Sequence, residues 1–281
     1  MTRRPAALLL ALLLPLALLA GCGDDDGGGG GGDQSTIARI EDRDKLIVGI
    51  KYDQPGFGLR TASGDFEGFD VEIAKLLAKE LLGDESKVEF KETPSKIREQ
   101  AIIDGDVDLV IATYTINDER KEKVSFAGPY YEAGQDIMVR ADETEIKSVK
   151  DLNGKKVCSV TGSTSIDNIK DEAPDADISR PFDTYSKCAE ELKNGRVDAV
   201  TTDNSILYGL ADQDEGAFKV LGDPFTEEPY GIGVKKDDDE MRDRVNEFLE
   251  KIQDNGEWEK AYAATVGKIR PGKVEPPPIE G

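Results

Sequence analysis

A seven-residue unit that occurs twice, 90 residues apart, constrains the fold of this chain more than any other feature. Residues 104–110 read Asp-Gly-Asp-Val-Asp-Leu-Val, and residues 194–200 read Asn-Gly-Arg-Val-Asp-Ala-Val. In each copy a helical pattern stops at the glycine and an apolar strand follows. Because glycine ends many helices, chance similarity is one explanation. A second pair, Phe126–Tyr130 and Phe225–Tyr230, repeats in the same order, which favours two related lobes.

Apolar runs typical of buried strands alternate with patterns typical of amphipathic helices. In the first half of the chain the expected strands are 46–50, 88–90 and 108–111, and the expected helices are 70–82 and 95–105. This alternation predicts an α/β lobe with a largely parallel sheet. A second lobe is expected to begin with its own strand, 157–160, and to contain a helix, 186–194.

Two extended runs, Ile137–Val139 and Ile232–Val234, follow the Pro-Tyr segments and are interpreted as the places where the chain crosses between the lobes. The last helix, 238–255, has apolar residues at helical spacing and is expected to pack on lobe one. The fold class is therefore α/β, with two lobes on a two-strand hinge. The predicted parts are a signal peptide (1–21), a tether (22–35), lobe one (36–136 and 226–268), lobe two (137–225) and a tail (269–281).

The N-terminal residues predict export and lipid attachment. Two arginines precede an apolar run, 6–20, which is shorter than the about 20 residues that cross a bilayer and is typical of a secretory signal. The segment Leu19-Ala20-Gly21-Cys22 resembles the lipobox of bacterial lipoproteins, and this resemblance implies cleavage before Cys22 and acylation of that residue. The glycine- and aspartate-rich stretch that follows has no apolar side chains to bury and predicts a flexible tether.

Two cysteines remain once Cys22 is assigned to the lipid. Cys158 and Cys188 would then lie outside the cell, where an oxidising compartment favours a disulfide between them. Such a bridge would stabilise the fold by roughly 3–4 kcal/mol on a chain-entropy estimate. Two buried free thiols are the alternative.

The composition excludes several classes of function. The chain has no histidine, which removes Ser-His-Asp and Cys-His nucleophile systems and His-ligated metals. Its formal net charge is −22, and it falls to −24 once the two arginines of the signal are removed. A surface this acidic is not expected to bind nucleic acid, because phosphate binding needs a basic surface. The composition indicates a protein that binds a molecule rather than transforms it, and no cofactor or metal is expected.

Four motifs occur in a fixed order along the chain: Gly68-Phe69-Asp70, Thr115–Arg120, Phe126–Tyr131 and Gly162–Ser165. Together they resemble the polar amino acid-binding proteins of bacterial ABC importers, the family-3 extracellular solute-binding proteins. The resemblance runs from about residue 45 to 262, and within the family it is greatest to the glutamate-binding lipoproteins of actinobacteria. It implies the type II periplasmic-binding-protein fold, in which two α/β lobes close over one ligand.

An amino acid is a zwitterion, so its site must pair one carboxylate and one ammonium. On sequence alone, Arg120 reads as a solvated residue in the charge run 118–123. The family motif places the carboxylate-binding arginine at this position, and a guanidinium can donate two parallel hydrogen bonds to a carboxylate. The same motif implies that Thr115 and the backbone at Thr113 share the α-groups of the ligand.

Lobe two is expected to supply the ammonium partner and further donors. The turn 162–165 follows a strand and opens a helix, so its N–H groups, with Ser163 and Thr164, can face an anion. A plain helix cap is a compatible alternative. Asp203 also reads as a helix N-cap, and the resemblance implies that its carboxylate pairs with the ligand ammonium.

The side-chain pocket decides which amino acid is bound. Lys51 lies at a strand end and Arg98 in the first turn of a helix, at the sheet edge where such folds place ligands. Two cations would select a carboxylate over an amide, and relatives that bind acidic amino acids carry basic residues there, which favours glutamate. Surface solvation is the alternative for both. Tyr185 is a candidate for the lobe-two wall, and Phe57 for an aromatic ring near the ligand stem.

These features predict a monomeric, lipid-anchored protein on the extracellular face of the membrane, which captures L-glutamate and delivers it to an ABC permease and its ATPase. Glutamine, aspartate or another polar amino acid is an alternative ligand. Two other classes stay open. One is a cyclohexadienyl dehydratase-like enzyme of the same fold, although the sequence contains no positioned acid or base beyond ordinary carboxylates. The other is an accessory sensor that contacts a signalling receptor.

Overall fold

The computed structural model describes residues 34–178, 181–269 and 274–280. The expected signal peptide, Cys22 and nearly all of the expected tether lie outside the described residues, as does part of the expected tail. The described chain contains two mixed sheets with separate cores and one small antiparallel sheet, and each mixed sheet with its helices is called a lobe below.

The sheet of lobe one has five strands, and parallel and antiparallel neighbours meet within it. β1 (Leu46–Ile50) is parallel to both of its neighbours, whereas β12 is antiparallel to both of its own. The strand order is β5 (Val88–Glu92), β1, β6 (Leu109–Val110), β12 (Glu228–Val234) and β7 (Ser125–Ala133). A small antiparallel sheet follows β1 and consists of β2 (Asp53–Gln54), β3 (Gly58–Arg60) and β4 (Phe66–Glu67).

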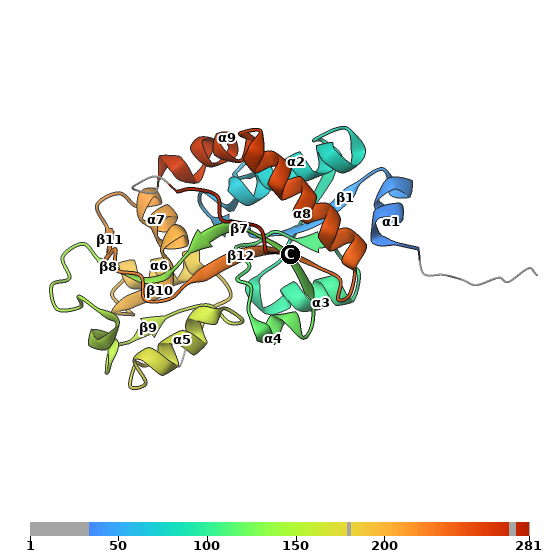
Figure 1. Cartoon of the computed structure of the whole chain (residues 1–281). Coiled ribbons are helices and arrows are strands. Elements are labelled where there is room, and N and C mark those ends of the chain that lie inside the picture. Colours follow the sequence, from blue (N-terminus) through green and yellow to red (C-terminus); the bar gives the residue numbers. More distant parts are fainter. Residues whose placement is uncertain (1–33, 179–180, 270–273, 281) are drawn as a thin grey trace, which may run out of the picture. The chain divides into compact units, whose positions relative to one another are not determined.

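Helices cover both faces of this sheet (Figure 1). On one face are α2 (Phe69–Leu82), α8 (Asp239–Asp254) and α9 (Glu257–Ala264), and on the other are α3 (Arg98–Ile103) and α4 (Asp118–Lys121). In α8 the buried apolar residues recur at helical spacing, so one stripe of the helix faces the core, as the sequence pattern predicts. The remaining elements are α1 (Thr36–Arg43), η1 (Ser95–Ile97) and η3 (Val266–Lys268).

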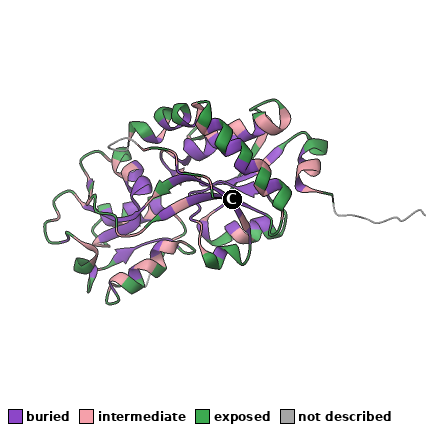
Figure 2. Ribbon diagram, in the orientation of Figure 1, coloured by how far each residue is buried: buried purple, intermediate pink, exposed green. Residues whose placement is uncertain are grey.

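Lobe two has a four-stranded sheet in the order β11 (Phe218–Val220), β8 (Gln135–Arg140), β10 (Ala199–Asp203) and β9 (Val157–Cys158). Its helices are α5 (Thr164–Glu172), α6 (Tyr185–Lys193), α7 (Asn204–Gln213) and η2 (Val149–Leu152). Helices α6 and α7 pack on one face of the sheet, and α5 packs on the other. Buried residues follow the central strands of both lobes (Figure 2).

The repeat in the sequence corresponds to a repeat in the topology. In lobe one β1 is parallel to β6, which is antiparallel to β12, and in lobe two β9 is parallel to β10, which is antiparallel to β8. In each lobe a helix ends just before a glycine in the left-handed region, Gly105 with φ 72° and Gly195 with φ 67°. Only glycine adopts this conformation without strain, which explains its presence in both copies of the unit.

The two crossings between the lobes differ from those expected. The chain leaves β7 at Ala133 and enters β8 at Gln135, so it crosses just before the 137–139 run and not within it. It returns immediately before β12, which pairs antiparallel with β7. A Cβ at Gly134 would lie 2.6 Å from the Thr226 carbonyl oxygen, which shows how closely the two crossings approach. The expected positions were wrong because the apolar side chains of the two runs belong to the sheet cores and do not mark the places where the chain crosses.

The cysteine pair forms a disulfide, which excludes the alternative of two free thiols. The bridge joins Cys158 at the end of β9 to Cys188 in α6. In the ranges 34–178, 181–269 and 274–280, every helix is too short or too polar to cross a bilayer.

Candidate functional site

A small cavity lies between the two lobes, at the edge where the parallel strands of both sheets end. Main-chain segments that leave β6 and β10 line it, as expected for a ligand site in an α/β fold. The lobe-one lining is Ser95, Arg98, Thr113, Thr115 and Arg120, and the lobe-two lining is Ser163, Thr164, Ser165, Tyr185, Thr202, Asp203 and Ile206. Eight of the nine ligand-binding residues proposed from the sequence are in this lining, and Lys51 is not.

Arg120 is buried, although its position in a charge run reads as solvated on sequence alone. The side chain of Asn117 accepts a hydrogen bond from the Arg120 backbone N–H at 2.9 Å and so begins α4. The guanidinium donates from Nη1 to the Thr115 carbonyl at 2.7 Å and from Nη2 to the Gly162 carbonyl at 3.2 Å. Its Nε lies 3.6 Å from the Glu99 carboxylate. The first turn of α4 therefore holds the guanidinium against the opposite lobe.

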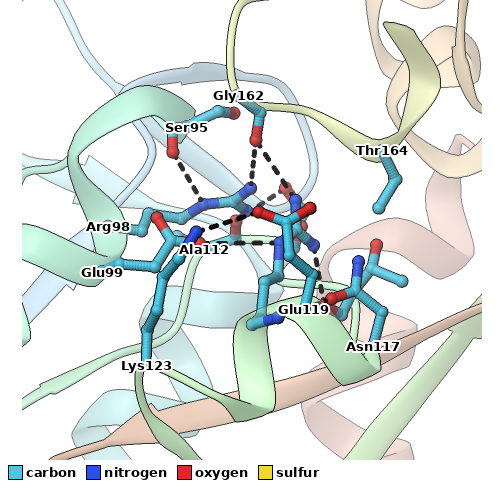
Figure 3. A network of polar contacts seen from close by, with 12 residues as sticks. Ser95, Arg98, Glu99, Ala112, Asn117, Glu119, Lys123, Gly162 and Thr164 are labelled. Carbon is cyan, nitrogen blue, oxygen red and sulfur yellow. Dashed lines mark hydrogen bonds and ion pairs between the residues drawn. The ribbon is translucent and has the colours of Figure 1, made fainter. Parts of the chain in front are cut away.

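Arg98 is a second buried guanidinium at the same place. Its Nη1 donates to the carbonyls of Ala112 and Thr113, each at 3.1 Å, and its Nη2 donates to the Gly162 carbonyl at 3.3 Å. Figure 3 shows the Gly162 carbonyl pointing across from lobe two toward this guanidinium. Burial and the nearby Arg120 lower the pKa of Arg98 to about 10, so the group stays charged at neutral pH.

Tyr114 supports both guanidinium groups. Its ring centroid lies 4.2 Å from the Arg98 Cζ and 5.0 Å from the Arg120 Cζ. Arginine stacks favourably on an aromatic face, and the interaction strengthens away from water. The sequence analysis missed this residue, although its position between Thr113 and Thr115 was a usable signal.

Lys51 is buried directly behind the cavity lining. It follows β1, and its Nζ donates to Ser95 Oγ at 2.6 Å. Burial, and next the charge of Arg98, hold the pKa of Lys51 well below its ordinary value. Lys51 therefore contacts the cavity lining only by way of Ser95. From the sequence, residue 95 was expected only as the start of the helix 95–105.

Asp203 provides the acidic group on the lobe-two side. It precedes α7 as the N-cap residue, but its side chain makes no cap hydrogen bond. Oδ2 accepts a hydrogen bond from the Tyr230 hydroxyl at 2.6 Å, whereas Oδ1 is buried and has no hydrogen-bond partner among the described residues. Burial, and next the nearby Glu228 carboxylate, raise the pKa of Asp203 to about 7. An unpaired buried carboxylate oxygen is costly, so a cationic ligand group would satisfy it.

Two hydroxyl groups of the lobe-two turn already have acceptors in the protein, one in lobe two and one at the start of β12. Ser163 Oγ donates to the Val160 carbonyl at 2.7 Å, and Thr164 Oγ1 donates to the Glu228 carboxylate at 2.9 Å. Ser163 is the N-cap residue of α5, but its side chain makes no cap hydrogen bond. The N–H groups in the first turn of α5 therefore have no acceptor from the N-cap side chain. Tyr185 is buried, and its hydroxyl lies 3.5 Å from Ser165 Oγ.

Phe57 does not fill the role proposed for it from the sequence. Its ring packs at 5.2 Å from Tyr131 and 5.8 Å from Tyr230, inside the core of lobe one. A loop between two short strands places the ring inward, away from the cavity lining. In the described part of the chain, no group of three or more His, Cys, Asp or Glu side chains could hold a metal ion.

Known proteins resemble this chain over most of its length. The "ABC transporter glutamine-binding protein GlnH" of Bacillus subtilis is 44% identical over 261 residues, which cover 91% of this chain and 94% of that protein. The "Glutamate-binding protein GluB" of Corynebacterium efficiens is 42% identical over 262 residues, which cover 90% and 88%.

Solved structures of the same fold are also similar. An ancestral arginine-binding protein bound to glutamine is 41% identical with a TM-score of 0.75, and the match covers 80% of this chain and 99% of that one. The ancestral amino acid-binding protein AncCDT-1, described as a precursor of cyclohexadienyl dehydratase, is 36% identical with a TM-score of 0.77, over 83% and 100%. These neighbours confirm the type II periplasmic-binding-protein fold that the resemblance implied.

One family model matches residues 46–268, a range that includes both sheets and all twelve residues of the cavity lining. Since that range is more than half of the chain, the protein belongs to the bacterial extracellular solute-binding proteins, family 3.

Proposed function

We propose that this protein captures L-glutamate between its two lobes and delivers it to an ABC permease. The observation that carries the proposal is the charge arrangement of the cavity. Lobe one supplies the buried cations Arg98, Arg120 and, behind Ser95, Lys51, whereas lobe two supplies Asp203 with one unpaired carboxylate oxygen. A ligand with one ammonium and two carboxylates matches these groups in sign, with one carboxylate for Arg120 and the other for Arg98 and Lys51 together.

Each group of glutamate has a counterpart in this assignment. Arg120 takes the α-carboxylate, with the backbone at Thr113 and Thr115 alongside, and Oδ1 of Asp203 takes the α-ammonium. Arg98 faces the side-chain carboxylate, and Lys51 acts on it from behind Ser95. Charge-assisted hydrogen bonds of this kind are roughly twice as strong as neutral ones, and a guanidinium matches a carboxylate in geometry.

Glutamine is the second candidate ligand. Two relatives at 43–44% identity carry glutamine in their names, and two at 42% carry glutamate. The buried cations favour glutamate, because an amide side chain would leave Lys51 and Arg98 without a compensating anion. The names alone therefore do not decide between the two ligands, and the charge of the cavity supports the proposal of glutamate.

Hydrogen bonds and an ion pair between the two lobes support a mechanism in which the lobes close over the ligand. Both cavity arginines donate to the Gly162 carbonyl of lobe two. At the rim, Lys96 of lobe one pairs with Asp183 of lobe two at 2.8 Å. A ligand held by groups of both lobes would favour this closed arrangement, since it adds contacts that the separated lobes lack.

We also propose that the protein is a lipid-anchored monomer, held on the outer face of the membrane by Cys22 and the tether, and that it partners a permease and its ATPase. A Cys22→Ser variant would be released from the membrane fraction and would no longer incorporate radiolabelled palmitate. Retention of both properties in that variant would contradict the anchoring proposal.

The proposed activity is binding without chemical change. The enzyme alternative is a cyclohexadienyl dehydratase-like activity, and the AncCDT-1 neighbour shares its fold with this chain. Prolonged incubation with prephenate or arogenate, followed by chromatography, would detect turnover. Product formation would replace the binding proposal with the enzymatic one.

A thermal-melting screen of residues 34–281 against the common amino acids tests the proposed ligand. Glutamate is expected to raise the Tm most, because a ligand that binds only the native state stabilises it by an amount set by its affinity. A larger shift with glutamine or aspartate would reassign the ligand. A shift with none of them would refute the proposed function.

A further inference from the structure

The motif Gly68-Phe69-Asp70 is not explained by contact with a ligand, because none of the three residues lines the cavity. Asp70 is nevertheless fully buried, in the first turn of α2. Its Oδ2 accepts the backbone N–H of Thr113 at 3.0 Å, and its Oδ1 accepts the Tyr130 hydroxyl at 2.7 Å. Both carboxylate oxygens therefore serve other elements of lobe one.

Thr113 is the point where this carboxylate meets the cavity. Its backbone is in the left-handed region with φ 44°, which is costly for a β-branched residue and persists only where the surroundings impose it. The Asp70 carboxylate fixes the N–H of this residue, and Gln54 Oε1 accepts a hydrogen bond from its hydroxyl at 3.0 Å.

The same turn holds Arg98. The carbonyl of Ala112, in the same peptide unit as the N–H that meets Asp70, and the carbonyl of Thr113, in the next peptide unit, both accept from the Arg98 guanidinium. A rotation of this turn would move both acceptors together. The carboxylate of Asp70 is thus one hydrogen bond and one short stretch of backbone away from a guanidinium that lines the cavity.

We propose that Asp70 is a positioning residue, which fixes the left-handed turn at Thr113 and through it aims the Arg98 guanidinium into the cavity. The inference deepens the proposed function and rests on it, since glutamate affinity is one of its two readouts. It also gives the Gly68-Phe69-Asp70 motif a physical role. The turn at Gly68, where a Cβ would lie 2.1 Å from the Phe57 carbonyl oxygen, sets the start of α2 and hence the place of Asp70.

Asp108 provides a matched control in the same lobe. It is also buried, and its Oδ2 accepts a backbone N–H of a neighbouring strand, that of Ile47, at 2.7 Å. It lies at the opposite end of β6 from the cavity lining. Removal of either carboxylate leaves a backbone N–H of lobe one without its acceptor, so both variants are expected to lower the Tm.

Calorimetric titration of the variants with glutamate is the first readout. Asp70→Ala is expected to weaken binding about 10- to 100-fold, the range for a lost hydrogen bond to a charged group, whereas Asp108→Ala stays within about threefold of the parent. Asp70→Asn keeps an oxygen acceptor for the Thr113 N–H and is expected to recover most of the loss. Parent-like affinity in Asp70→Ala, or an equal loss in Asp108→Ala, would overturn the proposal.

Hydrogen exchange without ligand is the second readout. Exchange at the Thr113 amide is expected to accelerate in Asp70→Ala and to stay slow in Asp108→Ala and Asp70→Asn. Unchanged exchange at Thr113 in folded Asp70→Ala would overturn the proposal. If Asp70→Ala does not fold, a loss of affinity above about 30-fold in folded Asp70→Asn would overturn it instead. Failure of the parent protein to bind glutamate would refute the proposed function, while the exchange comparison would still test Asp70.

Discussion

The two lobes place the same strand arrangement beside the cavity and then continue in opposite ways. In lobe one the chain leaves β6 through a turn at Thr113 and reaches Arg120 only after a further loop, within α4. In lobe two the chain leaves β10 at Asp203 and enters α7 at the next residue. The two lobes therefore share a topology but differ after the matching strand. Lobe one has a longer segment that ends in a basic side chain, whereas lobe two has one carboxylate directly at the strand end.

If the ligand is glutamate, as we propose, this difference is the means by which an acidic chain holds an acidic ligand. The formal net charge of −22 repels an anion at long range, so attraction must come from nearby groups. In lobe one, main-chain carbonyls accept most of the hydrogen bonds from the two guanidinium groups and bring no full negative charge. The Glu99 carboxylate, 3.6 Å from Arg120 Nε, is the exception. Lobe two contributes a buried carboxylate oxygen that has no hydrogen-bond partner among the described residues, Oδ1 of Asp203.

Removal of the lobe-one clamp is expected to have the largest effect. Arg120→Ala deletes the partner of the α-carboxylate and leaves that charge buried and unpaired, which weakens both glutamate and glutamine binding about 100- to 1000-fold. Arg120→Lys keeps the charge but not the two-pronged geometry and should fall between. Calorimetry measures both variants. Parent-like affinity in Arg120→Ala would show that lobe one does not hold the α-carboxylate.

Removal of the side-chain cation separates the two candidate ligands. Lys51→Met is expected to weaken glutamate binding about tenfold and glutamine binding by less than about threefold, because only glutamate brings a second carboxylate. Competition titrations of both ligands on one variant give the ratio directly. Equal losses for the two ligands would mean that Lys51 acts only through the position of Ser95.

The tyrosine behind Asp203 is expected to have a smaller effect. Tyr230→Phe keeps the ring, which stacks on Tyr131 at 5.6 Å, and removes only the hydroxyl that bonds Oδ2 of Asp203. A carboxylate that loses this donor is held less firmly, so glutamate affinity should fall about fivefold, as measured by calorimetry. An unchanged affinity would show that other contacts orient Asp203.

The pH dependence of binding tests the same carboxylate. A ligand ammonium favours ionised Asp203, so binding near or below the raised pKa of about 7 should release a proton, and affinity should fall as the pH falls from 8 to 6. In the free protein the sign is opposite. Because the folded protein holds the Asp203 proton more tightly than the unfolded chain, protonation of this group adds to the free energy of unfolding. This contribution is fully present below the ordinary pKa of 3.8 and is lost as the pH rises through 7.

Calorimetry in buffers of different ionisation enthalpy measures the proton release on binding. Asp203→Asn is the control, because it should remove the part of the pH response that belongs to this group. A parent-like pH response in Asp203→Asn would assign the titration to another carboxyl group, and burial also raises the pKa of Asp70, to about 6.

The smallest expected effect on affinity belongs to the disulfide, which is a feature of lobe two. Replacement of Cys158 and Cys188 by serine should lower the Tm by about 10 °C, since closing a loop with sequence separation 30 stabilises a fold of this size by roughly 3–4 kcal/mol. Glutamate affinity should change by less than about threefold, because neither sulfur lines the cavity. A larger loss of affinity would show that the bridge holds the 162–165 turn in place.

Helical spacing, strand alternation and the repeated unit predicted the α/β class and the two-lobed fold, because these depend on local periodicity and on burial. The crossings were misplaced by a few residues, since apolar side chains at Ile137 and Val139 mark a sheet core and not a hinge. Residues of the motifs Thr115–Arg120 and Gly162–Ser165 come together at one cavity, but their ligand roles stay predictions.

The parts of the site that sequence could not provide depend on contacts between distant segments. Tyr230 reaches Asp203 from the returning strand, and Asp70 reaches Thr113 from 43 residues away. No local pattern encodes these pairs. Phe57 was misassigned for the same reason, because only the packed core shows which way the ring points.

Opposite charges on opposite lobes are the central claim, and one pair of titrations tests it most directly. Asp203→Ala is titrated with glutamate and with glutarate, the five-carbon dicarboxylate that lacks the ammonium. Affinity for glutamate is expected to fall about 100-fold or more, while affinity for glutarate holds or rises because a repelling carboxylate is gone. Equal losses for the two ligands would contradict the claim and would make Asp203 a structural residue of lobe two.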